Sequence, residues 1–311
     1  MNVDQVRAAA STLREATDRP FNLTFFIQDA PRTEPVVLEA TRQRLALWFI
    51  AAGLGAPPET LPELGPSFDD ARLALLLEIR PAVVSFHFGL PAPDAIPALK
   101  AAGVVVISTA TTVAEARALE RVGVDAVIAQ GYEAGGHRGS HRPTPPGAGV
   151  GTMALIPQVV DAVDVPVIAA GGIGDGRGIS AAFALGASGV QMGTAFLFCP
   201  EAGTDAPRRA RLRCATDTDT LVTDAFSGRQ ARAMRSRYAE AMEASREPLP
   251  AFRQMYDLSD PLVAAGPEDE VSFHLYGQAA TLNREMAAAD LIGKLTGEAT
   301  EAFARLSRLG T

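Results

Sequence analysis

Apolar runs of strand length recur along the first two thirds of the chain at nearly constant spacing. Three of them begin at residues 82, 104 and 126, which are 22 residues apart, and two later ones begin at 166 and 189, which are 23 residues apart. Each run is apolar throughout rather than alternating, which is typical of parallel strands covered on both faces. Because a helical stretch separates one run from the next, the pattern predicts a β-strand/α-helix repeat.

Six strands are expected in all, and a helix is already under way over residues 1–20, where Pro20 ends it. The expected strands are 21–27, 82–88, 104–108, 126–130, 166–170 and 189–193, and the helices between the later ones are 92–102, 112–122, 152–163 and 176–185. We therefore predict an α/β fold, a parallel TIM (β/α)8-type barrel. Since such a barrel needs eight strands, the first two βα units are expected to be missing; a doubly wound open sheet would need no such gap.

The regular recurrence of strand-length apolar runs stops near residue 200. Eight arginines crowd the stretch 208–237, which predicts either a solvated face or a positive rim that steers an anionic substrate. We expect residues 1–200 to form the barrel and 201–272 a smaller, mainly helical substrate or lid subdomain. Residues 273–311 are expected to form a C-terminal helix, over 281–309, that returns to the barrel.

The composition excludes several classes of function. Lys and Arg number 28 against 36 Asp and Glu, a net charge of −8, which disfavours nucleic acid and anionic membrane as partners. The longest apolar stretch, 45–57, is too short to span a bilayer, and the N-terminus lacks a secretory h-region, so we expect a cytoplasmic protein. Cys199 and Cys214 cannot form a disulfide framework or a structural zinc site, and no His/Asp/Glu spacing suggests a metal.

The strongest local motif is QGYEAGGHRG, residues 130–139, at the end of an expected strand. Active sites of parallel barrels lie at that end. Gly135 and Gly136 let the backbone pass close to a ligand, and His137 follows them. Because imidazole titrates near neutral pH, His137 is our candidate for the residue that gives or takes a proton.

A second motif, AAGGIGDGRG at 169–178, runs from a strand through a glycine-dense turn into a helix. Backbone N–H groups in such a turn can cradle an anion. It is neither a Walker A loop nor a Rossmann fingerprint. Together with QMGT at 191–194 it matches the phosphate site that barrels form after their last two strands.

The remaining histidines, the two cysteines and the segment 223–232 are weaker candidates for a functional role. His87 ends a strand and is expected either to face the site or to be a packed or hydrogen-bonded histidine, and His141 and His274 are expected at the surface. Neither cysteine has the surroundings of a nucleophile. The segment TDAFSGRQAR, 223–232, is distinctive, but its spacing suggests no mechanism.

Four segments in order resemble the nitronate monooxygenase family, formerly called 2-nitropropane dioxygenases. They are QGYEAGGHRG (130–139), PVIAAGGIGDGRG (166–178), GVQMGTAFL (189–197) and, resembling the class I branch, AFSGRQAR (225–232). The resemblance covers essentially the whole chain. It implies a TIM barrel that binds FMN, with a smaller substrate domain.

The resemblance also implies roles for particular residues. His137 matches the family's catalytic histidine, which orients an anionic nitronate or acts as base on a nitroalkane. The implied FMN-binding residues are Asn22, Gln130, Gly135, Gly172, Gln191, Met192, Gly193 and Thr194. Of these, Gly172, Gly193 and Thr194 would hold the phosphate. The implied reaction takes a nitronate, such as propionate 3-nitronate, and O2 to an aldehyde or keto product and nitrite, without nicotinamide.

The chain departs from the family pattern at its start, where opening strands resembling PIIQAPM and GGLGS are missing. Two alternatives remain open. One is an FMN-dependent enoyl-(acyl carrier protein) reductase, which would consume NAD(P)H. The other is a truncated, non-catalytic barrel that only binds flavin or phosphate.

Overall fold

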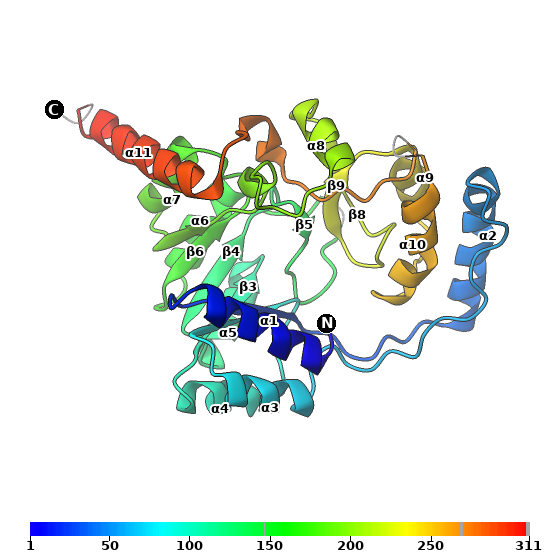
Figure 1. The fold of residues 1–311 in the computed structure, drawn as a ribbon, viewed down its shortest axis with the longest axis horizontal. Coiled ribbons are helices and arrows are strands. Elements are labelled where there is room, and N and C mark those ends of the chain that lie inside the picture. Colours follow the sequence, from blue (N-terminus) through cyan, green and yellow to red (C-terminus); the bar gives the residue numbers. More distant parts are fainter. Residues whose placement is uncertain (146, 268–269, 309–311) are drawn as a thin grey trace.

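Six parallel strands form the main sheet of the computed structural model, which describes residues 1–145, 147–267 and 270–308 (Figure 1). The sheet order is β1-β2-β3-β4-β6-β7. The strands are β1 (Asn22–Phe26), β2 (Val83–His87), β3 (Val105–Ala110), β4 (Ala126–Gln130), β6 (Val167–Ala170) and β7 (Gly189–Gln191). All six strands predicted from the sequence are confirmed.

Neighbouring strands in the sheet follow one another along the chain, so each new strand is added on the same side. A doubly wound sheet reverses its direction of growth at a switch point, and this sheet does not. The sheet curls as part of a TIM-type barrel, and β1 and β7 are its two edges in the part of the chain that the structure describes. The fold is therefore a TIM-barrel-like half barrel.

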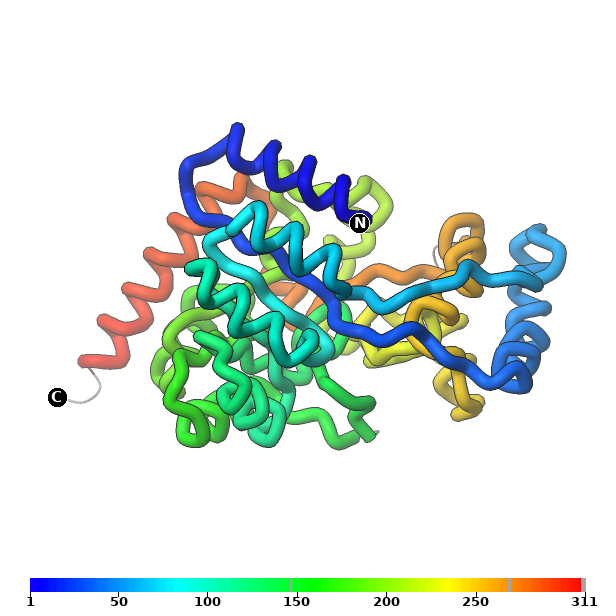
Figure 2. Tube along the Cα trace, turned by 90° about the horizontal axis from the view of Figure 1, so that it is seen from below, coloured from blue at the N-terminus to red at the C-terminus, as the bar shows by residue number. Residues whose placement is uncertain are grey.

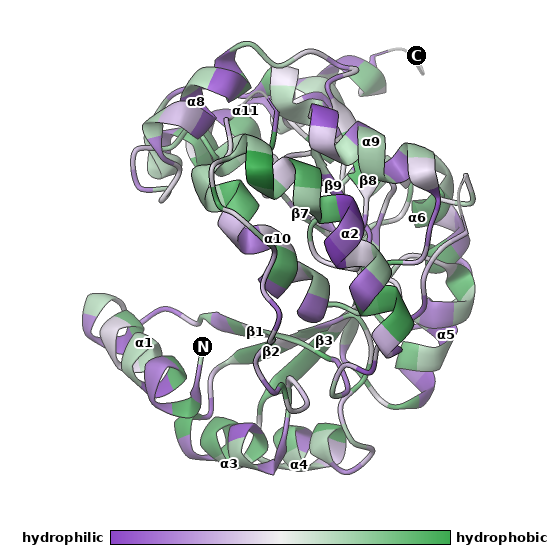
Figure 3. Cartoon of the chain, turned by 90° about the vertical axis from the view of Figure 1, so that its right-hand side faces the viewer, coloured by the Kyte–Doolittle hydropathy of each residue, from purple (hydrophilic) through white to green (hydrophobic). Residues whose placement is uncertain are grey.

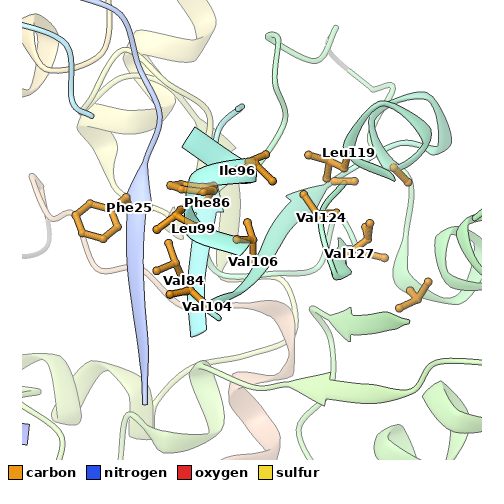
Figure 4. Close-up of a cluster of buried hydrophobic side chains, with 14 of the residues drawn as sticks. Phe25, Val84, Phe86, Ile96, Leu99, Val104, Val106, Leu119, Val124 and Val127 are labelled. Atoms are coloured by element: carbon orange, nitrogen blue, oxygen red, sulfur yellow. The ribbon is translucent and has the colours of Figure 1, made fainter. Parts of the chain in front are cut away.

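Helices cover the outer face of this sheet and enclose its core. They are α1 (Val3–Ala16), α3 (Asp70–Ile79), α4 (Ala95–Ala101), α5 (Val113–Arg121), α6 (Thr152–Val160) and α7 (Gly176–Ala184). In Figure 4, Val84, Phe86 and Val106 of neighbouring strands lie together with Ile96 and Leu99 of α4. Burial of this aliphatic layer holds the strands in register and so fixes where their carboxyl ends meet.

A second core lies beside the barrel. Its sheet is antiparallel, in the order β5-β9-β8, with strands β5 (Gly136–His137), β8 (Thr220–Thr223) and β9 (Ala231–Met234). Three helices pack against it: α2 (Pro35–Ala51), α9 (Arg237–Ser245) and α10 (Gln254–Ala265). The segment 201–272, expected to be mainly helical, thus also supplies two strands.

Helix α2 belongs to this second core although it follows β1 in sequence. Leu45 and Phe49 of α2 are buried there with Met255 and Leu258 of α10. Figures 1 and 2 show the two extended segments that run out to α2 and back, side by side. The N–H of Ser67 donates to the carbonyl of Gln28 where they meet the barrel, at 2.8 Å.

The C-terminal helix packs on the barrel. Helix α11 (Ala288–Ser307) packs on α7, where the Ser180 hydroxyl donates to the Ala299 carbonyl at 3.0 Å. The helix was expected from 281. Instead the 3-10 helix η2 (Gln278–Leu282) precedes it, and residue 309 lies outside the described residues. The remaining elements are η1 (Thr194–Phe196) and α8 (Ala206–Arg213).

Hydropathy follows this arrangement. In Figure 3 the hydrophobic colour lies along β2, whereas α2 carries both hydrophilic and hydrophobic residues. None of the helices within the described ranges is both long and apolar enough to cross a bilayer.

Candidate active site

A hollow of about 150 Å³ opens at the carboxyl ends of β4, β6 and β7. Its lining includes seven of the eight residues to which the sequence assigned cofactor binding: Gln130, Gly135, Gly172, Gln191, Met192, Gly193 and Thr194. These residues come from three separate strand ends. Parallel strands bring their carboxyl ends to one edge, which is why motifs 60 residues apart meet here.

The predicted phosphate cradle consists of two backbone turns. Gly172, with φ of +71°, lies in the turn after β6, and Gly193 lies between β7 and η1. Neither glycine donates its N–H to another residue in the described part of the chain. A Cβ on Gly193 would meet no atom within 4 Å, so the wall of the hollow is open there. Unpaired N–H groups beside open space suit an anion.

The start of α7, by contrast, is already occupied by the protein's own carboxylates. Asp175 accepts from the N–H groups of Arg177 (3.0 Å) and Gly178 (3.3 Å). Glu298 accepts from Gly176 N–H at 3.2 Å. Anion binding in the hollow therefore depends on the turns at Gly172 and Gly193 rather than on the helix N-terminus.

Thr194 adds a side chain to this cradle. Its hydroxyl oxygen accepts from the N–H of Gly277 at 2.9 Å. The hydroxyl proton remains available to donate to an anion. Gly277 and Ala279 also line the hollow, a contribution that the sequence analysis missed. No local pattern marks them, since only the return of the chain after α10 brings them here.

Gln130 uses its side chain to hold the glycine–histidine loop. Its Nε2 donates to the His137 carbonyl at 3.1 Å, and its Oε1 accepts from Gly139 N–H at 2.8 Å. The Nε2 of His87 donates to the same His137 carbonyl at 3.2 Å. Nδ1 of His87 is then the acceptor for the Thr109 hydroxyl at 3.0 Å. His87 is thus a hydrogen-bonded histidine that supports the loop, which is one of the alternatives expected from the sequence.

His137 lies on the two-residue strand β5, which pairs with β9 of the second core. Its Nε2 lies 2.9 Å from the Ser227 hydroxyl. Burial lowers the pKa of His137 to about 4, with smaller contributions in the same direction from His87 and the Arg229 cation. The imidazole is therefore neutral at physiological pH and able to accept a proton.

Four phenylalanine rings surround the His137 imidazole, from four separate parts of the chain. Their centroids lie 5.4 to 6.2 Å from the imidazole centroid, and they belong to Phe26, Phe88, Phe252 and Phe273. Phe88 has a φ of +81°, which is strained for a bulky residue. This apolar shell is the reason for the lowered pKa.

Five of the eight arginines in the segment 208–237 fall into two groups. Arg213, Arg235 and Arg237 form exposed ion pairs with glutamates. Arg229 and Arg232 instead lie inside the molecule: the Arg229 guanidinium covers the Phe88 ring at 3.9 Å, and Arg232 donates to the Tyr132 carbonyl at 2.7 Å. Only the second group reaches the loop that carries His137.

The structure leaves the other candidates away from the hollow. Asn22 is absent from its lining. It lies at the amino end of β1, exposed, where its side chain donates to Ser85 Oγ at 2.8 Å. His274 is buried, against the expectation of a surface position. Cys199 is buried with its pKa raised by that burial, which is the wrong direction for a nucleophile. The described residues contain no group of three or more His, Cys, Asp or Glu that could hold a metal ion.

Comparisons with known proteins agree with this architecture. The family model described as nitronate monooxygenase matches residues 1–298. The nitronate monooxygenase of Pseudomonas aeruginosa is 42% identical over 299 residues, which cover 94% of this chain and 85% of that protein.

Two solved structures are similar as well. The nitroalkane oxidase of Streptomyces ansochromogenes has a TM-score of 0.88 and 38% identity, over 98% of this chain and 87% of that chain. FabK from Thermotoga maritima has a TM-score of 0.73 and 30% identity, over 99% and 85%. The chain therefore belongs to the nitronate monooxygenase family and is an oxidoreductase.

Proposed function

We propose that this chain oxidises alkyl nitronates, such as propionate 3-nitronate, with FMN and O2, and releases an aldehyde or keto product and nitrite. The observation that carries the proposal is the open glycine cradle at the strand ends with His137 on the adjoining loop. The similarity to nitronate monooxygenases and to a nitroalkane oxidase supports the substrate class.

The residues of the hollow fit FMN by their chemistry. Gly172 and Gly193 present unpaired N–H groups and Thr194 a hydroxyl, which suits a phosphate. Gln130, Gly135, Gln191 and Met192 line the remaining wall. Bound there, FMN would supply the electron transfer that the side chains present cannot perform. Asn22, which lies apart from the hollow, has no such support.

His137 is proposed to be the catalytic residue. Its imidazole is neutral and apolar rings enclose it, so it can take the α-proton of a nitroalkane or orient a nitronate. In the same proposal residues 1–200 hold the cofactor and 201–272 cover the substrate. The partners are then small molecules, nitronate and O2, and the expected location is the cytoplasm.

A visible spectrum of the purified chain tests the proposal. It is recorded before and after anaerobic addition of propionate 3-nitronate, without nicotinamide. Flavin absorbance that changes on addition, and returns on admission of air with release of nitrite, is the expected result. A flavin spectrum that is unchanged by the nitronate but changes on addition of NAD(P)H would favour an enoyl reductase. A colourless protein, or one whose flavin responds to neither reagent, would favour a non-catalytic barrel.

A further inference from the structure

Ser227 lies in the connection between β8 and β9 and reaches His137 from the second core. It is only 1% exposed. The connection is a tight turn, in which the N–H groups of Ser227 (3.2 Å) and Gly228 (2.8 Å) both donate to the Asp224 carbonyl. The hydroxyl therefore has little freedom to move relative to the imidazole.

Counting protons assigns the direction of the contact between Ser227 and His137. The Ser227 oxygen lies 3.0 Å from the Arg229 carbonyl, which can only accept. A hydroxyl has one proton, and Ser227 donates it there. The Ser227 oxygen also accepts from the Arg229 N–H at 3.4 Å. With its proton donated to the Arg229 carbonyl, it accepts at the contact with His137 as well, 2.9 Å away, so Nε2 of His137 carries the hydrogen.

Nδ1 of the neutral imidazole is consequently unprotonated. No described residue forms a hydrogen bond with Nδ1, so its lone pair is not committed within the protein. In this assignment His137 does not activate Ser227 as a nucleophile, since the serine proton is donated to the Arg229 carbonyl and not to the imidazole.

We propose that Ser227 is a positioning residue that fixes the Nε2–H tautomer of His137 and so makes Nδ1 the proton-accepting atom. This inference builds on the proposed function. With a nitroalkane, the α C–H bond breaks, the proton forms an N–H bond at Nδ1, and the electron pair moves into the nitro group to give the nitronate. The imidazolium that results keeps donating from Nε2 to Ser227, which stabilises its charge.

Few charged groups face His137 to disturb this assignment. His87 from β2 and Arg229 from the turn are the titratable ones, and both oppose a positive charge on the ring. Among the described residues, the aromatic rings that pack on the imidazole are Phe26, Phe88, Phe252 and Phe273, none of which titrates. Ser227 is thus the group that accepts the hydrogen bond from Nε2–H of His137.

The tautomer is measurable without turnover. Long-range ¹H–¹⁵N correlation spectra of histidine-labelled protein distinguish the protonated from the unprotonated ring nitrogen, and His137→Asn identifies the signals. We expect hydrogen on Nε2 in the wild type, and a shift of population toward Nδ1–H in Ser227→Ala. Hydrogen on Nδ1 in the wild type, or an unchanged tautomer in Ser227→Ala, would overturn the proposal.

Ser272→Ala is the matched control. Ser272 is buried beside Phe273, and its hydroxyl has no hydrogen-bond partner among the described residues. Ser227→Ala should lower kcat/KM for a neutral nitroalkane by about tenfold or more, yet lower that for its nitronate much less, since the nitronate needs no base. Ser272→Ala should leave the ratio of the two unchanged. An equal fall for both substrates would contradict a role in proton transfer. If neither substrate reacts with the wild type, the proposed function fails, while the spectra still decide the tautomer.

Discussion

The side chain of Gln130 fixes the backbone on which His137 stands. Nε2 of Gln130 donates to the His137 carbonyl at 3.1 Å, and Oε1 accepts from the N–H of Gly139 at 2.8 Å. Gln130 ends β4 and is 8% exposed. A strand of the barrel thus sets the position of a loop that also pairs with the second core.

Replacing Gln130 should loosen that loop. Gln130→Leu leaves the buried Gly139 N–H without an acceptor, which costs about 1–3 kcal/mol. We expect urea denaturation to show a loss of this size, together with lower turnover. Gln158→Leu, at an exposed position of α6, should change neither. Full stability in Gln130→Leu would show that the amide does not hold the loop.

The role of His137 is tested by His137→Asn. Asparagine is polar and smaller but cannot accept a proton at neutral pH. We expect flavin content to remain near that of the wild type and nitroalkane turnover to fall by about 10²–10⁴-fold. His141→Asn, on the same loop, should retain turnover. Unchanged turnover in His137→Asn would show that the histidine is wrongly assigned.

A substitution at Gly193 should weaken cofactor binding and leave folding nearly unchanged. A Cβ there meets no atom within 4 Å and φ is −112°, so Gly193→Val should change the free energy of unfolding by no more than about 1 kcal/mol. The added side chain would stand in the hollow, and we expect the Kd for FMN to rise at least tenfold, about 1.4 kcal/mol. Gly203→Val is the control, since Gly203 is equally open but outside the hollow. FMN titration followed by fluorescence measures both.

The sequence predicted the barrel because its signals are local. Continuous apolar runs, helices between them and glycine turns at the strand ends each depend on neighbouring residues. The seven hollow residues could be assembled in advance, since parallel strands must bring their carboxyl ends together. The same rule does not place Asn22 with them, since Asn22 stands at the amino end of its strand, and only the family resemblance assigned it to the cofactor.

The second core could not be predicted in the same way. Its helix α2 and its strands β8 and β9 are brought together by contacts far apart in sequence. Strand β5 has two residues, too few for any periodic pattern, yet its pairing with β9 brings Ser227 to His137. The segment TDAFSGRQAR, 223–232, is distinctive in the sequence, but its spacing does not predict that its serine contacts His137.

Gly135 and Gly136 are adjacent in the loop, and a different structural constraint favours glycine at each position. A Cβ on Gly135 would lie 2.4 Å from backbone atoms of Tyr276 and Gly277, which cannot move aside easily. We expect Gly135→Ala to cost about 3 kcal/mol or more, because overpacking here is against backbone. Gly136 has φ of +79° but open space, so Gly136→Ala should cost about 1–2 kcal/mol. Equal losses in urea denaturation would contradict the distinction.

The two site histidines should make stability depend on pH. Burial lowers the pKa of both His87 and His137 to about 4, whereas an unfolded chain takes up the proton near pH 6.5. Between these pH values the unfolded state binds more protons than the folded state, so the free energy of unfolding rises with pH. The stability that the two histidines contribute is therefore lost as the pH falls from 6.5 toward 4. One such histidine contributes about 3 kcal/mol across the full window.

Because carboxylates also titrate at the acid end, the decisive measurement is a difference: urea denaturation at pH 7.5 and 4.5 for the wild type and for His87→Gln. We expect a smaller loss at pH 4.5 in the variant, since glutamine does not titrate. An identical loss in both proteins would show that His87 is already protonated in the fold.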